Sequence, residues 1–164
     1  MSELVVRPGS RDDLEQLNDL YNHYVRTSAC TFDIEEISMD ERRAWFEGFG
    51  GRYKLLVAVD GDRVVGYSHS KSFRPKQAYE TSVEVTAYVA HDAHGRGIGS
   101  QLYRALFDGL ADDDVHRAYA GITMPNPVSV ALHERFGFKQ VAYFTEQGRK
   151  FDKYWDVAWF EKKP

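Results

Sequence analysis

The most regular pattern in the chain is an alternation of apolar and polar residues between Thr81 and Val89, where valine or alanine occupies every second position. A period of two predicts a β-strand with two unlike faces. Its polar face carries Ser82, Glu84, Thr86 and Tyr88. Three alternating glycines follow, and then a helical stripe made of Ile98, Leu102, Ala105, Leu106 and Leu110. The segment therefore predicts a strand, a glycine-rich loop and a helix in succession.

Two capping boxes predict helices nearer the N-terminus. Ser10 with Asp13 precedes an apolar stripe that runs to Val25, and Ser38 with Glu41 precedes another that contains Trp45, Phe46 and Phe49. This spacing is typical of helix starts. Glycines 48, 50 and 51 are expected to end the second helix. Residues 27–33 show no period and are expected to form a loop.

Short apolar runs predict the remaining strands, which are residues 4–7, 55–59, 64–67, 118–122, 138–144 and 154–160. Asp60-Gly61-Asp62 predicts a hairpin turn, and Gln147-Gly148-Arg149 is expected to join the last two strands. Asn126, Pro127 and Gly137 bound one more short helix. The order β, α, α, β, β, β, α, β, α, β, β predicts an α/β domain with a mostly antiparallel sheet.

Composition narrows the function classes. The 164 residues, 43% apolar and 28% charged, predict one globular domain over residues 1–164. A net charge of −4 without a basic run argues against nucleic acid as a partner. Cys30 is the only cysteine, which excludes an internal disulfide and a cysteine zinc cluster. No apolar stretch is long enough for a signal or a membrane span, so we expect no membrane partner and a cytoplasmic location.

The glycines after the central strand suggest a phosphate site. The first turn of a helix presents unpaired N–H groups and the positive end of its dipole, and glycine lets an anion approach the backbone closely. A Walker loop is excluded, because no Lys-Ser or Lys-Thr pair follows. A dinucleotide fingerprint would place its third glycine at Ser100. A flexible loop is the plain alternative. His91 and His94 in the same turn do not make a metal site, and we expect none.

The segment His94-Gly95-Arg96-Gly97-Ile98-Gly99 resembles the acyl-CoA loop of the GNAT N-acetyltransferases, in which Arg or Gln is followed by two residues, Gly, one residue, and Gly or Ala. His94 stands where that family has Arg or Gln. The resemblance implies the GNAT acyl-CoA N-acyltransferase fold (α/β, also described as α+β), with a mixed, mostly antiparallel central sheet flanked by about four helices. It also implies acetyl-CoA as cosubstrate and no metal.

Further segments resemble the phosphinothricin and methionine sulfone (sulfoximine) acetyltransferase branch of that family. They are Thr31-Phe32-Asp33, Phe73-Arg74-Pro75, Ala78-Tyr79, Val83-Glu84-Val85, residues 129–138 and Gly148-Arg149-Lys150-Phe151. The resemblance implies direct transfer of the acetyl group, in a ternary complex, to the primary amine of a small amino-acid-like substrate such as phosphinothricin, methionine sulfoximine or methionine sulfone. It further implies a homodimer and a role in detoxification or herbicide and antibiotic resistance.

The resemblance assigns roles to individual residues. Glu84 is implied as the base that takes a proton from the amine, and His133 as the acid that protonates the CoA thiolate. Cofactor contacts are implied at Ala87, Tyr88, Val89, Gly95, Arg96, Gly97, Ile98, Gly99, Ser100 and Asn126. Substrate contacts are implied at Phe32, Phe73, Arg74, Tyr79 and Ser82.

Plainer interpretations stay open for several of these residues. Glu84 lies on the polar face of its strand and could be an ordinary exposed acid. Asn126 could serve only as a helix N-cap. His133 and Arg74 could be surface residues, and the phenylalanines could belong to the core.

Two rival functions also stay open. A protein or peptide N-acetyltransferase would need a groove open at both ends. A non-catalytic acyl-CoA sensor would keep the glycine loop but tolerate the loss of Glu84.

Overall fold

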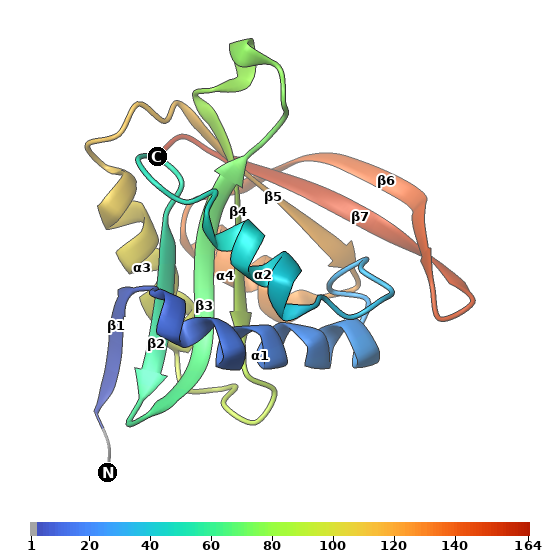
Figure 1. Ribbon diagram of the computed structural model, residues 1–164. Coiled ribbons are helices and arrows are strands. Elements are labelled where there is room, and N and C mark those ends of the chain that lie inside the picture. The colour runs from blue at the N-terminus through green and yellow to red at the C-terminus, as the bar shows by residue number, and fades with distance from the viewer. Residues whose placement is uncertain (1–2) are drawn as a thin grey trace.

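The computed structural model describes residues 3–164 (Figure 1). One seven-stranded sheet has the order β1-β2-β3-β4-β5-β7-β6. Its strands are β1 (Leu4–Pro8), β2 (Leu55–Asp60), β3 (Arg63–Ser72), β4 (Ser82–Val89), β5 (Arg117–Met124), β6 (Lys139–Lys150) and β7 (Lys153–Lys162). Only β4 and β5 pair in parallel, and the other neighbours are antiparallel. The prediction of a mixed, mostly antiparallel sheet is confirmed.

Helices cover both faces of the sheet. They are α1 (Leu14–Thr27), α2 (Met39–Phe46), α3 (Ile98–Leu110) and α4 (Pro127–Arg135), with short 3-10 turns at Arg11–Asp13 and Gln77–Tyr79. Figure 1 shows α1 and α2 crossing one face, with α3 and α4 on the other. The helical stripe of α3 is buried against the sheet, and Leu102 and Leu106 are fully covered. Both predicted capping boxes are present, at Ser10 and at Ser38. No helix among residues 3–164 has the length and apolarity needed to cross a membrane.

The connection between the last two strands differs from the prediction. Residues 147–149 lie inside β6, and the turn falls at Phe151 and Asp152, whose φ angles are 54° and 55°. The physical reason is an irregularity in β6 between Phe144 and Gly148 that shifts the register and lets the strand continue. Gly148 is required by packing instead, because a β-carbon there would lie 2.3 Å from the ring of Phe32.

The central strands β4 and β5 diverge. They pair only where residues 82–84 face residues 117–119, and then separate although both continue (Figure 1). On the other side of β4, the N–H of Ala90 donates to the carbonyl of Val65 over 2.8 Å, next to the Gly66–Val89 pair. Backbone groups alternate in direction along an antiparallel strand. Those of Val85, Ala87 and Val89 therefore face away from β3, toward the gap that β5 leaves.

Candidate active site

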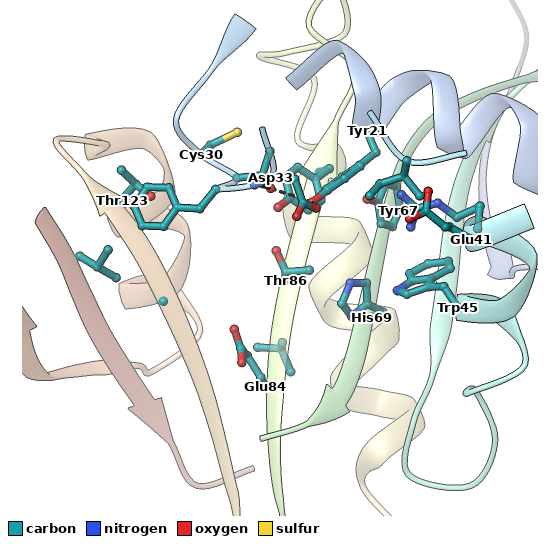
Figure 2. A pocket seen from close by; sticks show the side chains of 18 of the residues that line it. Tyr21, Cys30, Asp33, Glu41, Trp45, Tyr67, His69, Glu84, Thr86 and Thr123 are labelled. Carbon is teal, nitrogen blue, oxygen red and sulfur yellow. Dashed lines mark hydrogen bonds between the residues drawn. The ribbon is translucent and has the colours of Figure 1, made fainter. Parts of the chain in front are cut away.

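A cavity of about 520 Å³ lies where β4 and β5 separate (Figure 2). Strand β4 contributes Glu84, Val85, Thr86 and Tyr88, and the opposite wall comes from β5, β6 and β7. Helices α1 and α2 and the loop between them close the remaining side. The other lining residues are Tyr21, Cys30, Thr31, Phe32, Asp33, Ile37, Glu41, Arg42, Trp45, Tyr67, His69, Gly121, Thr123, Gln147, Val157 and Trp159.

Glu84 is half-buried in the cavity wall. Figure 2 shows its carboxylate directed between the diverging strands. Burial raises the pKa of Glu84, and the positive charge of Arg74 partly opposes this rise. The interpretation of Glu84 as an ordinary exposed acid is therefore wrong. A raised pKa brings a carboxylate closer to the range in which it can exchange protons at neutral pH.

The glycine loop leads into the first turn of α3. Gly95 and Gly97 have φ angles of 80° and 72°, a left-handed conformation that glycine adopts without strain. Gly97 is the N-cap residue and no side chain caps the helix, so the first N–H groups of α3 keep their hydrogen-bonding capacity. A β-carbon at either glycine would meet nothing within 4 Å. This open, side-chain-free surface fits the diphosphate of acetyl-CoA.

Side chains of the loop tie it to the rest of the protein. Arg96 pairs with Asp60 at 2.9 Å, and Arg63 pairs with Asp92 at 2.7 Å, so both ends of the loop are attached to the β2–β3 hairpin. His94 Nε2 lies 2.9 Å from the Tyr24 hydroxyl, which donates to the carbonyl of Val89. The side chains of Arg96 and His94 therefore position the loop and leave its backbone available for an anion.

His133 lies inside the protein, with 5% of its surface exposed. Its Nδ1 is 2.7 Å from the carbonyl of Ser129, and its Nε2 is 2.7 Å from the Tyr103 hydroxyl. Burial lowers the pKa of His133. The surface-helix interpretation is therefore wrong. Both ring nitrogens of His133 are engaged and the residue does not line the cavity, so this geometry disfavours a role as the acid that protonates the thiolate. That role stays a prediction.

Asn126 accepts a hydrogen bond from the N–H of Ser129 at 3.1 Å, as expected of a helix N-cap. Its predicted contact with the cofactor stays a prediction.

The predicted substrate residues fall into two groups. Phe32 lines the cavity, with 38% of its surface exposed. Phe73, Arg74, Tyr79 and Ser82 do not line it. Phe73 stacks on Tyr119 with ring centres 4.4 Å apart, and the Arg74 guanidinium lies 4.4 Å from the centre of the Phe73 ring. Phe73 also makes a T-shaped contact with Trp159, a cavity residue, so Phe73 borders the site from outside, with Tyr79 and Arg74 packed against it.

Several cavity residues were not singled out from the sequence. The hydroxyl of Tyr21 bonds to Thr31 Oγ1 at 2.7 Å and to the carboxylate of Asp33, which joins α1 to the loop after it. Arg42 on α2 and His69 on β3 also line the cavity, where they add a positive charge and a polar ring. One signal was available for Arg42, because it lies three residues before Trp45 and so shares the apolar face of its helix.

Cys30 lines the cavity as a free thiol, and burial raises its pKa. A raised pKa lowers the thiolate fraction, which is the nucleophilic form. No group of three or more His, Cys, Asp or Glu residues within residues 3–164 is arranged to hold a metal ion.

Comparisons with known proteins agree with this geometry. Residues 7–159 match the family described as acetyltransferase (GNAT) domain. The phosphinothricin N-acetyltransferase of Streptomyces coelicolor is 54% identical over 98% of this chain and 96% of its own. The L-methionine sulfoximine/L-methionine sulfone acetyltransferase of Pseudomonas paraeruginosa is 29% identical over 95% of this chain and 92% of its own.

A solved structure shares the whole architecture. The GNAT superfamily phosphinothricin acetyltransferase from Sinorhizobium meliloti, in complex with acetyl-CoA, superposes with a TM-score of 0.92 at 28% identity. The alignment covers 99% of this chain and 89% of that one.

Proposed function

Because this chain belongs to the acetyltransferase (GNAT) family and is an acetyl-CoA-dependent acyltransferase, we propose that it acetylates the primary amine of a small amino-acid-like substrate. The substrate class is that of phosphinothricin, methionine sulfoximine and methionine sulfone. The observation that carries the proposal is Glu84, held half-buried in the wall of a cavity of about 520 Å³, beside backbone groups left unpaired by β5. The relative that is 54% identical supports the substrate class.

The proposed chemistry is direct transfer between two bound substrates. Acetyl-CoA supplies the activated acetyl group. An amide C–N bond forms and a C–S bond breaks. Starting from the ammonium form, the nitrogen loses two protons, of which one is balanced by protonation of the thiolate and the other passes through the base to solvent. An α-amine has a pKa of about 8 and is mostly protonated at neutral pH. Glu84 accepts that proton, directly or through a water molecule.

Two backbone features complete the proposed site. The first-turn N–H groups of α3, from Ile98 to Ser100, hold the diphosphate. The N–H of Val89 faces the gap between the strands and can donate to an oxygen on which negative charge develops. Contacts of Ala87, Tyr88 and Asn126 with the cofactor belong to the same proposal. Since His133 has no free nitrogen, water is the better candidate for protonating the thiolate.

We extend the proposal to a homodimer. Large side chains on the β6–β7 hairpin are exposed, and β6 is an edge strand of the sheet. They are Val141, Tyr143, Phe144, Phe151 and Tyr154. An exposed apolar edge of this kind is a typical association surface. Sedimentation of the protein with and without Tyr143→Glu tests it.

A cytoplasmic location and a role in detoxification or resistance are also proposals. The single thiol of Cys30 is free, as a reducing compartment permits.

The experiment for the activity is thiol release from acetyl-CoA with a panel of amines. Phosphinothricin, methionine sulfoximine and methionine sulfone are compared with ordinary amino acids, polyamines and N-terminal peptides. Turnover confined to the first three supports the proposal, and turnover of the peptides alone favours the peptide acetyltransferase. Tight acetyl-CoA binding without turnover of any amine favours the sensor.

A further inference from the structure

Arg42 is a buried cation without an anionic partner. Only 4% of its surface is exposed. Its Nε donates to Asn18 Oδ1 at 2.9 Å, and its guanidinium carbon lies 4.8 Å from the ring centre of Tyr21 and 4.4 Å from that of Trp45. Among residues 3–164, no carboxylate oxygen lies within 4.0 Å of the guanidinium. A buried charge is costly unless it is paired.

One end of this guanidinium has no hydrogen-bond partner among the described residues, and Arg42 is one of the residues that line the cavity. Nε is the only nitrogen of Arg42 with a side-chain acceptor among the described residues. Asn18 is itself fixed, because its amide donates to the carbonyl of Ile37 at 2.8 Å. The plane of the guanidinium is thus held by one amide and two aromatic rings. A guanidinium held in a fixed plane presents parallel N–H donors and is suited to bidentate binding of an oxyanion.

The other charged or polar groups near Arg42 are Lys71, His69 and the carboxylate of Glu41. The pKa of Glu41 is lowered mainly by the N–H of Ser38 and to a smaller degree by the charge of Arg42. Lys71 Nζ lies 5.1 Å from the ring centre of Trp45, and burial together with the charge of Arg42 lowers the pKa of Lys71. His69 adds a buried Nδ1 that has no hydrogen-bond partner. Figure 2 shows His69 and Trp45 together, apart from Glu84.

The two cavity carboxylates that lie nearest to Arg42 in the sequence already accept hydrogen bonds from other groups. Glu41 accepts from the N–H of Ser38 at 2.7 Å in the capping box of α2, and Asp33 accepts from the hydroxyl of Tyr21. Glu84 lies on β4, on the side where we place the amine. The cavity is therefore polarised, with a proton acceptor at one side and an unpaired guanidinium at the other.

We infer that Arg42 binds an oxyanion of the amine substrate and selects substrates that carry a negative charge at a set distance from the amine. The inference rests on the proposed function, because it assigns a second group to the same substrate. The oxyanion is either the α-carboxylate or, in phosphinothricin, the phosphinate, and both offer the paired oxygens that a guanidinium recognises.

The test is calorimetric binding of three probes to the CoA-saturated protein. Phosphinothricin carries a carboxylate and a phosphinate, methionine sulfone carries only the carboxylate, and 3-(methylsulfonyl)propylamine carries neither. In Arg42→Met we expect the Kd of phosphinothricin to rise at least about tenfold, as for loss of a charge-assisted pair. An equal rise for methionine sulfone identifies the carboxylate, and an unchanged value identifies the phosphinate. The Kd of the amine that carries no anionic group should change less than about twofold.

Arg43→Met is the matched control. Arg43 is the next residue of the same helix, is exposed, and pairs with Asp40 at 2.9 Å, so its loss should leave all three affinities unchanged. Arg42→Met removes a costly buried charge but also leaves Asn18 Oδ1 without its donor, so its unfolding midpoint is measured together with its affinities. If that variant fails to fold, Arg42→Lys replaces it, and its Kd for phosphinothricin should still rise because the fork of donors is lost.

Two results overturn the inference. One is unchanged affinity for both anionic probes in the folded Arg42 variant, and the other is failure of the wild-type protein to bind either of them. Failure of the proposed function is a separate observation, namely binding of the probes without thiol release from acetyl-CoA.

Discussion

The hydroxyl of Tyr103 on α3 lies 2.7 Å from Nε2 of His133 on α4, and both side chains are buried. The carbonyl of Ser129 lies at 2.7 Å from the other ring nitrogen, so that nitrogen carries the proton and Nε2 accepts from the hydroxyl. This chain of hydrogen bonds joins two helices on one face of the sheet. His133 therefore has a structural role in linking α3 to α4.

The first prediction concerns this pair. Tyr103→Phe leaves Nε2 of His133 buried without a donor, and we expect the free energy of unfolding to fall by about 1–3 kcal/mol. We expect kcat to change less than about twofold. Urea denaturation and steady-state kinetics check both. A large loss of kcat with unchanged stability would instead support the predicted role of His133 as the acid.

The second prediction concerns Glu84. Glu84→Gln keeps the shape of the side chain but removes the proton acceptor, so we expect kcat to fall about 100-fold or more while acetyl-CoA affinity is kept. Because the pKa of Glu84 is raised, the wild-type rate should fall as the pH drops through that raised value. This acid limb should be absent in the variant. Unchanged turnover would remove Glu84 from the mechanism.

The third prediction concerns stability in acid. Burial, with smaller contributions from the charges of Lys71 and Arg42, lowers the pKa of His69 to about 3. The native state therefore keeps this imidazole neutral, while the unfolded chain binds a proton below its ordinary pKa of about 6.5. Stability should be complete above pH ~7 and should be lost progressively as the pH falls from about 6.5 toward 3.

His69→Phe tests this dependence, because phenylalanine suits a site between Trp45, Phe49 and Tyr67 and does not titrate. Urea midpoints at pH 7.5 and pH 5 should differ less in the variant than in the wild type. Replacing the exposed His116 by Gln is the control and should leave the difference unchanged. An equal difference in all three proteins would assign the acid sensitivity to other groups.

The fourth prediction concerns the glycine loop. Gly97→Ala places a side chain at a φ angle of 72°, a strained conformation for alanine that shifts the first N–H groups of α3. We expect the Kd of acetyl-CoA to rise about tenfold. Gly137→Ala, at a φ angle of 84° and with the same open surroundings, is the control for backbone strain alone. Gly137→Ala should lower stability similarly but leave the Kd of acetyl-CoA unchanged.

Local signals predicted most of the fold. The capping boxes at Ser10 and Ser38 act over three residues, so they can be read from the sequence alone. The turn after β6 could not be read, because Phe151 and Asp152 adopt positive φ angles that usually indicate glycine or asparagine. Gly148 suggested a turn, yet its small size is needed for a contact with Phe32, more than a hundred residues earlier.

The part of the candidate site that was predictable from the sequence lies on consecutive elements of the chain. Glu84 and the glycine loop occupy a single strand-loop-helix unit, so their order in the sequence is their order in space. Arg42 and His69 were missed because their use depends on α2 packing beside β3. His133 was predicted to face the reaction, but its burial depends on Tyr103 in another helix.

The last prediction uses the contact between Gly148 and Phe32. In Gly148→Ala the new β-carbon would lie 2.3 Å from Cε2 of Phe32, and real β-carbons essentially never approach so closely. The aromatic ring must move, and since Phe32 lines the cavity, the shape of the amine site changes. We expect KM for the amine to rise about tenfold while the Kd of acetyl-CoA stays within about twofold, because the glycine loop lies elsewhere.

A double-mutant cycle separates this contact from a general loss of stability. Phe32→Ala removes the ring, so adding Gly148→Ala to it should cost little more, and the two effects on KM should be clearly less than additive. Additive effects would show that Gly148 acts without Phe32. Since the contact connects the β6–β7 hairpin to the loop after α1, a less than additive result would mean that the hairpin shapes the amine site through a single aromatic ring.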